Sequence, residues 1–112
     1  MGNNVILLRS FARSAKKLAK RYRSFTDDLT KLIAELKVNP MLGVSLGGNL
    51  RKVRLAIQSK GKGKSGGARV ITYVVLVEET IFLLAVYDKS DMENIPDEDL
   101  KSLVDELKNE MR

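Results

Sequence analysis

Two basic side chains share one face of a predicted strand. The run Lys52–Ile57 alternates charged and apolar residues, which is the pattern of a strand with one buried face. Since successive side chains of a strand point to opposite faces, Lys52 and Arg54 stand side by side. Arg69 opens the next strand-like run. Guanidinium groups pair with phosphate oxygens through two parallel hydrogen bonds, so this face suits a phosphate-bearing partner.

A basic, glycine-rich segment connects these two strands. Lys60, Lys62 and Lys64 alternate with Gly, and no Asp or Glu lies between Glu35 and Glu78. Glycine lets the backbone approach a ligand closely, and unpaired lysines attract phosphate. We therefore predict a mobile cationic loop that contacts phosphate. A solvated hairpin loop without a binding role is the simpler interpretation of the same residues.

The composition excludes several kinds of chemistry. The 112 residues contain neither Cys nor His, which removes disulfides, thiolate catalysis and the usual general base at neutral pH. Acid–base chemistry must then use Lys, Tyr, Arg or a carboxylate. The apolar run Val5–Leu8 is too short for a signal peptide, and no run approaches the roughly 20 residues of a membrane span. We expect a single cytoplasmic domain over residues 1–112.

The charge is unevenly distributed along the chain. Residues 1–69 hold 16 Lys and Arg against 3 Asp and Glu, whereas residues 70–112 hold 4 against 11. This asymmetry indicates a basic working surface followed by an acidic tail. Lys16, Lys17 and Lys20 lie off the apolar stripe of a predicted helix, where they form either a nucleic-acid docking surface or an ordinary solvated face.

The spacing of apolar residues predicts seven elements. They are a strand at Val5–Leu8, a helix capped by Ser10, a helix capped by Thr26 and ended by Asn39-Pro40, strands at Lys52–Ile57, Arg69–Val77 and Ile81–Asp88, and a helix from Pro96. Met41–Asn49 is expected as a loop, and Ser90–Glu93 as one turn of helix. The order β-α-α-β-β-β-α predicts an α+β fold, with a helical hairpin packed on a mostly antiparallel twisted sheet and a further C-terminal helix.

Five segments, taken together, resemble a known family. These are Phe11–Leu18, Asn39–Gly43, Lys52–Leu55, Lys60–Val70 and Tyr87–Ser90. In this order they resemble the RelE/ParE superfamily of bacterial toxins, and most closely its HigB-like RelE branch. The resemblance implies a RelE-like fold with the same order of elements. It also implies a ribosome-dependent mRNA endonuclease of a type II toxin–antitoxin pair, with the cognate antitoxin, the ribosome and mRNA as partners and without a cofactor.

The resemblance also implies a basic site on the sheet. Lys52 and Arg54 match the family's basic residues on the first strand of the central hairpin, and Arg69 matches the arginine that opens the next strand. Lys89 lies near the family's basic residue after the last strand. The family's tyrosine comes later in the chain than Tyr87.

RNA cleavage requires a 2′-hydroxyl to lose its proton and attack the adjacent phosphorus, while charge grows on the phosphate oxygens. We expect Arg54 and Arg69 to stabilise this charge, because fixed guanidinium groups pair with phosphate oxygens. Tyr87 is expected to stack on a base or donate a proton. No metal is expected, since no carboxylates cluster on this face. Four lysines are candidates for the general base: Lys52, Lys62, Lys64 and Lys89. Lys60 joins Lys52, Lys62 and the three helix lysines as RNA-binding residues.

Two other functions fit a basic domain of this kind. One is a ParE-like inhibitor of DNA gyrase, which would not cleave RNA. The other is a non-catalytic nucleic-acid-binding module, which would bind in a salt-sensitive way without cutting the strand. Aromatic residues make up only 5% of the chain, which argues against a platform for stacking single-stranded bases.

Overall fold

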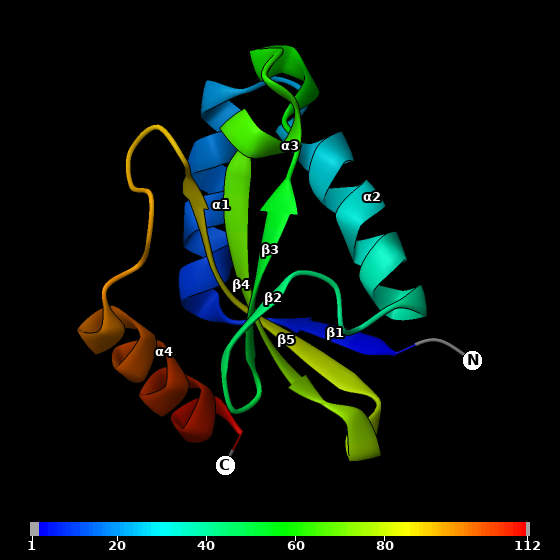
Figure 1. The fold of residues 1–112 in the computed structure, drawn as a ribbon, viewed down its shortest axis with the longest axis vertical. Helices are drawn as coiled ribbons and strands as arrows, with labels where there is room; N and C mark the ends of the chain where they lie inside the picture. Colours follow the sequence, from blue (N-terminus) through cyan, green and yellow to red (C-terminus); the bar gives the residue numbers. More distant parts are fainter. Residues whose placement is uncertain (1–2, 112) are drawn as a thin grey trace.

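The computed structural model describes residues 3–111 as a five-stranded sheet with helices around it (Figure 1). The spatial strand order is β1-β5-β4-β3-β2, in which β1 pairs with β5 in parallel and all other pairs are antiparallel. Two 3₁₀ turns, Gln58–Lys60 and Leu76–Glu78, lie beside the sheet. The strands and helices are β1 (Asn4–Leu7), α1 (Arg9–Arg21), α2 (Phe25–Val38), β2 (Val44–Gly47), β3 (Leu50–Leu55), α3 (Gly63–Gly66), β4 (Ala68–Val75), β5 (Thr80–Asp88) and α4 (Asp97–Glu110).

The predicted α+β class and the mostly antiparallel sheet are confirmed, but the segment 41–49 is more than a loop. It contains the short edge strand β2, whose four residues are too few to stand out as a pattern. Gly43, with φ of +88°, leads into this strand, and a Cβ there would lie 2.2 Å from the carbonyl oxygen of Lys52. Only glycine permits both the backbone angle and this close approach.

The two helix caps predicted from the sequence are wrong. Ser10 lies inside the first turn of α1, and its Oγ lies within hydrogen-bond distance of two acceptors, the carbonyl of Leu84 and the carboxylate of Glu106. Thr26 lies inside α2, because the helix begins one residue before it. Ser24 precedes the helix, and its Oγ donates to the Asp28 carboxylate. The hydroxyls of Ser10 and Ser24 therefore bond to side chains or to a distant carbonyl, and neither caps a backbone amide of its helix.

The residues after β5 form a turn and no helix. The amide groups of Asp91 and Met92 both donate to the carbonyl of Asp88, and the chain then runs irregularly to Pro96. One turn with a single helical hydrogen bond does not propagate without further bonds, so the predicted turn of helix at Ser90–Glu93 is wrong.

The final helix begins where its acidic residues predict. Asp97, Glu98 and Asp99 occupy the first turn of α4, next to the positive end of the helix dipole. At 14 residues each, α2 and α4 are the longest helices. Within residues 3–111, no helix has the length and apolar character needed to cross a membrane.

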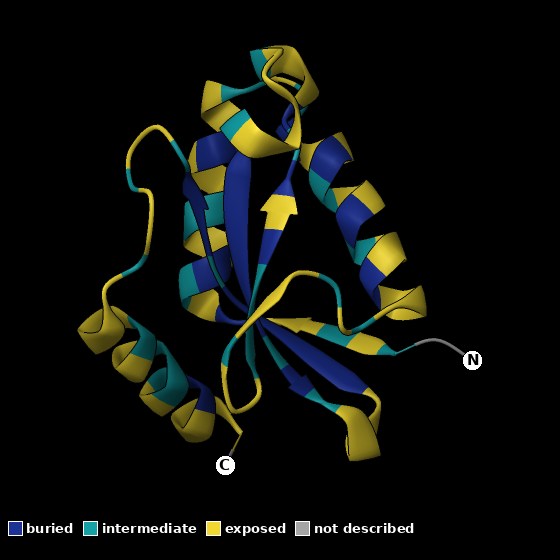
Figure 2. Cartoon of the chain, viewed as in Figure 1, coloured by how far each residue is buried: buried dark blue, intermediate teal, exposed yellow. Residues whose placement is uncertain are grey.

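Cross-strand pairing shows which sheet face the first helices cover. Leu55 pairs with Ala68, and Ala68 pairs with Asp88, so the three side chains share one face. Asp88 contacts Tyr22 at the end of α1, which places this row under the helices. The central strands β4 and β5 are buried along most of their length (Figure 2). The rows adjacent to this one must therefore face the other side of the sheet.

Candidate basic site

The adjacent row of the sheet contains three predicted site residues. Arg54 pairs with Arg69, and Arg69 pairs with Tyr87, so these three side chains stand on the face opposite Asp88. Lys52 lies two residues before Arg54 and shares that face. Alternation along the strand places Lys52 and Arg54 on one face, and the antiparallel register adds Arg69 to that face.

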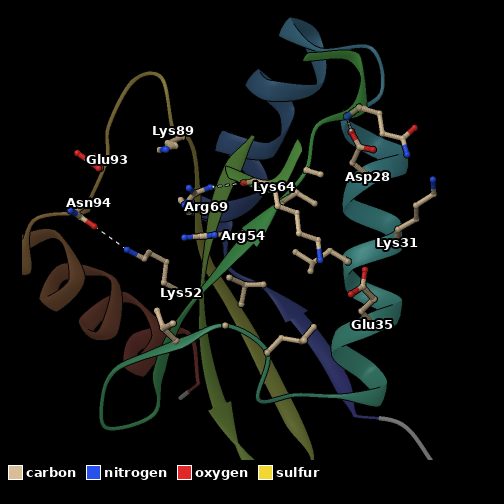
Figure 3. A pocket seen from close by; sticks show the side chains of 18 residues that line it. Asp28, Lys31, Glu35, Lys52, Arg54, Lys64, Arg69, Lys89, Glu93 and Asn94 are labelled. Atoms are coloured by element: carbon tan, nitrogen blue, oxygen red, sulfur yellow. Dashed lines mark hydrogen bonds between the residues drawn. The ribbon is translucent and has the colours of Figure 1, made fainter. Parts of the chain in front are cut away.

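A cavity of about 730 Å³ opens between α2 and the edge of β3. It exists because β2 pairs with β3 only as far as Lys52, so the edge of β3 beyond that residue has no neighbouring strand. Figure 3 shows the lining side chains, which come from α2, β2, β3, α3, β4 and the loops around them. We call this space the basic cavity, after the five predicted cations that line it: Lys52, Arg54, Lys64, Arg69 and Lys89.

Arg54 is a cation of the cavity that is available to a ligand. Its side chain is exposed, and within residues 3–111 it makes no hydrogen bond or ion pair through its guanidinium. Its guanidinium lies beside that of Arg69 in Figure 3. An arginine with free donors next to a second cation is suited to bind a phosphate group in a bidentate way.

Arg69 is held more tightly than the sequence predicted. It is only 5% exposed, and its Nη1 donates to the carbonyls of Lys64 and Ala68 at 3.1 and 3.0 Å. Its Nη2 donates to the carbonyl of Ser65 at 3.0 Å. An arginine has five N–H donors, so two remain for a ligand. Arg69 thus fixes the loop that precedes β4 as well as adding charge to the cavity.

Four lysines line the cavity, and the three that were predicted as site residues occupy different positions. Lys52 donates from Nζ to Asn94 Oδ1 at 2.9 Å, which links β3 to the segment after β5. Lys64 is exposed and reaches across the cavity toward α2, whereas Lys89 is half-buried above Arg69 (Figure 3). A phosphate in the cavity would therefore be approached from three sides.

Sequence reasoning missed the acidic and polar rim of this cavity. Asp28, Lys31 and Glu35 line it from α2, and Glu93 and Asn94 line it from the opposite side. The spacing of the three α2 residues places them on one helical face, a signal that was available in the sequence. No local pattern marks the other two. Among residues 3–111, no group of three or more acidic, Cys or His side chains is arranged to hold a metal ion.

Tyr87 lies outside the cavity lining. Its ring is 9% exposed, and its hydroxyl is buried without a hydrogen-bond partner among the described residues. Burial raises the pKa of the Tyr87 phenol, while the charge of Arg69 and the amide of Ile95 act in the opposite direction. A buried phenol is not placed to stack on an RNA base or to donate a proton to it.

Apart from Lys52, which lines the cavity, the predicted RNA-binding lysines fall into two groups. Lys60 corrects the expectation of an unpaired loop, because its Nζ lies 2.6 Å from Asp88 Oδ1 and its side chain is 8% exposed. The segment is also ordered by a 3₁₀ turn and by the short helix α3. The other lysines are exposed and lie outside the cavity lining: Lys62 on the loop, and Lys16, Lys17 and Lys20 on α1.

Comparison with known proteins identifies the family. A family profile described as the RelE toxin of the RelE/RelB toxin–antitoxin system matches residues 4–110. Among solved structures, a double arginine mutant of Escherichia coli toxin RelE in the free state is 17% identical, with a TM-score of 0.59 over 83% of this chain and 90% of that one.

Two further structures share the fold. The isolated Escherichia coli RelE toxin is 15% identical, with a TM-score of 0.59 over 94% of this chain and 98% of that one. The toxin–antitoxin complex RelBE2 from Mycobacterium tuberculosis is also 15% identical, with a TM-score of 0.61 over 79% of this chain and 99% of that one. With the family profile covering nearly its whole length, this chain belongs to the RelE family of toxins from toxin–antitoxin systems.

Proposed function

We propose that this toxin is a ribosome-dependent mRNA endonuclease and that the basic cavity is its active site. The observation that carries the proposal is the convergence of five cationic side chains on one cavity beside an exposed strand edge. None of these five side chains forms an ion pair among the described residues. No ion pair among the described residues therefore competes with a substrate for these side chains, and RNA offers the complementary phosphate at every nucleotide.

The proposed reaction needs only groups of the protein and the RNA. A lysine of the cavity in its neutral form takes the proton of the 2′-hydroxyl, whose oxygen attacks the adjacent phosphorus. The bond from phosphorus to the 5′-oxygen breaks, and a second ammonium group gives a proton to this leaving oxygen. The products are a 2′,3′-cyclic phosphate and a 5′-hydroxyl. Arg54 and the free donors of Arg69 stabilise the charge on the phosphate oxygens.

The ribosome supplies what the cavity lacks. No histidine is present to act as an efficient base, so the reaction depends strongly on the placement of the 2′-hydroxyl. Messenger RNA held by the ribosome meets that requirement, whereas free RNA does not. We assign Lys62 and the exposed lysines of α1 (Lys16, Lys17 and Lys20) to contacts with ribosomal RNA, because phosphate contacts position a protein without reading sequence.

The second partner is an antitoxin. Membership of a toxin–antitoxin family and the solved RelBE2 complex of a relative support a cognate antitoxin for this chain. Co-expression of the adjacent reading frame should restore growth to cells that make the toxin. Failure of every neighbouring frame to restore growth would contradict this assignment.

The endonuclease assignment is tested by brief induction of the toxin followed by mapping of 5′ ends in cellular mRNA. We expect new 5′ ends within translated regions, absent in cells that make the Arg54→Ala variant. A gyrase inhibitor would instead induce the DNA-damage response without new mRNA ends. A binding module would give neither result, and either outcome would refute the proposal.

A further inference from the structure

A buried cluster on the far side of the sheet connects the two segments that carry Lys64 and Lys89. At its centre is Asp88, whose side chain is fully buried. Its Oδ1 accepts from Lys60 Nζ at 2.6 Å and from the amide of Ser90 at 2.8 Å. Its Oδ2 accepts from the hydroxyl of Tyr22 at 2.5 Å. One carboxylate thus holds the end of α1, the turn after β5 and the segment 60–67, which we call the basic loop.

The bonds of Asp88 outweigh the cost of burying its charge. Burial alone would raise the pKa of this carboxyl, but the bonds from Lys60, Tyr22 and Ser90 hold the pKa well below its ordinary value of 3.8. Lys60 also donates to Ser90 Oγ at 2.7 Å. The ammonium group is nearly buried, so it depends on these oxygens as much as they depend on it.

The basic loop is therefore fixed at both ends. At its start, Lys60 is bound to Asp88 and Ser90. At its end, the carbonyl of Gly67 accepts from the amide of Lys89, the residue that follows Asp88. Lys64 lies between these two anchors, so the loop crosses to the cavity with little freedom at either end.

We propose that Asp88 is a positioning residue, which sets Lys64 and Lys89 in the basic cavity by holding Lys60 and the turn after β5. The inference rests on the proposed endonuclease function of that cavity. Asp88 itself lies on the opposite face of the sheet and does not touch the substrate. It acts through the two cations, and displacement of such groups by about 1 Å can slow a reaction roughly 100-fold.

The chain offers a matched control three residues away. Asp91 accepts from Arg21 at 2.9 Å, but both side chains of this pair are about half exposed. Asp88→Asn and Asp91→Asn each remove one negative charge near the end of β5, and Arg21 lies within 3.5 Å of the first carboxylate and 2.9 Å of the second. Only the first leaves a buried ammonium group without its carboxylate, so only the first should free the loop.

The first experiment compares these two variants with the wild type. Hydrogen exchange of the amides from Gly61 to Gly67 reports the order of the loop without requiring catalysis. Single-turnover cleavage of mRNA on ribosomes, corrected for the folded fraction, reports the chemical step. We expect Asp88→Asn to speed loop exchange at least tenfold and slow cleavage roughly 10- to 100-fold, with Asp91→Asn close to wild type in both. Unchanged loop exchange in Asp88→Asn would overturn the proposal.

A double variant separates positioning from stability. Asp88→Asn combined with Lys60→Met leaves no unpaired buried charge, so we expect much of the lost stability to return. Cleavage should nevertheless remain slow, because the loop is still untethered. Recovery of the cleavage rate together with stability would show that Asp88 serves stability alone.

A mutant cycle that combines Asp88→Asn with replacement of Lys64 and Lys89 completes the test. In a Lys64→Ala/Lys89→Ala background, Asp88→Asn should have little further effect on cleavage, because its route of action has been removed. Fully additive losses would contradict the proposal. If the wild type itself does not cleave mRNA on ribosomes, the proposed function fails, and the exchange comparison alone decides whether Asp88 holds the loop.

Discussion

Replacement of Arg54 by alanine should abolish most activity while leaving the fold unchanged. The side chain is exposed and has no internal partner among residues 3–111, so the free energy of unfolding should change by less than about 0.5 kcal/mol. In the transition state, a guanidinium bound to a phosphate in a bidentate way contributes about 3 kcal/mol. Its loss should slow cleavage about 100-fold.

Arg51 supplies a matched control on the same strand. It belongs to β3 but lies outside the basic cavity, and it donates to the carbonyls of Leu42 and Gly43 at 3.2 and 2.9 Å. Arg51→Ala removes the same charge and should cost roughly 1–3 kcal/mol of stability, since two hydrogen bonds are lost. Its cleavage rate should remain within a factor of about three of wild type.

The assay for this pair combines urea unfolding with single-turnover cleavage on ribosomes at matched folded protein. We expect the two variants to rank oppositely in the two measurements. Arg54→Ala should be the more stable protein and cleave slowly, whereas Arg51→Ala should be less stable and cleave fast. A folded Arg54→Ala protein that cleaves as fast as the wild type would refute a mechanism centred on the basic cavity. Equal loss of activity in both variants would show that total charge, and not position, matters.

Four further predictions follow from individual contacts. Arg69→Ala leaves the carbonyls of Lys64, Ser65 and Ala68 without this donor. The free energy of unfolding, measured with urea, should fall by roughly 2–4 kcal/mol. Gly67→Ala places a Cβ 2.1 Å from the carbonyl oxygen of Leu55, so the thermal midpoint should fall by more than about 5 °C. Tyr87→Phe removes a buried hydroxyl that has no hydrogen-bond partner within residues 3–111, so the free energy of unfolding and the cleavage rate should remain nearly unchanged. The depressed pKa of Asp88 gives stability that is complete above about pH 5 and is lost as the pH falls through 3.8 and below.

Each of these predictions has a contrary outcome. An Arg69→Ala protein as stable as the wild type would mean that the guanidinium does not hold the loop. A tolerated alanine at Gly67 would mean that the loop end can move away from β3. Loss of cleavage in Tyr87→Phe would restore the catalytic role predicted from the sequence. If Asp88→Asn shows the same acid unfolding as the wild type, another carboxylate governs that transition.

The sequence was informative where periodicity determined the structure. Alternation placed Lys52 and Arg54 on one face, and the same rule applied across strands put Arg69 beside them. It failed where only four residues form an edge strand, as in β2, and where a hydroxyl had several possible partners, as with Ser10. Local patterns do not record which distant carbonyl or carboxylate a side chain will meet.

The sequence predicted which charged residues belong to the candidate site, but not the residues with which they form hydrogen bonds or ion pairs. The absence of acids near Lys60 in the sequence suggested a free cation, yet Asp88 reaches it across 28 positions. Tyr87 shares the face of Arg69, but packing buries its hydroxyl and keeps it from the cavity. These outcomes depend on tertiary contacts, which determine whether a charged or polar group is available to a ligand.

Purified components test most directly whether the basic cavity cleaves mRNA on the ribosome. A 5′-labelled mRNA positioned on ribosomes is incubated with the wild type or with Arg54→Ala, and the ends of the products are analysed. We expect the wild type to cleave the mRNA to a 2′,3′-cyclic phosphate and a 5′-hydroxyl, and the variant to cleave it about 100-fold more slowly. Intact mRNA with the wild type, or equal cleavage by both proteins, would contradict it.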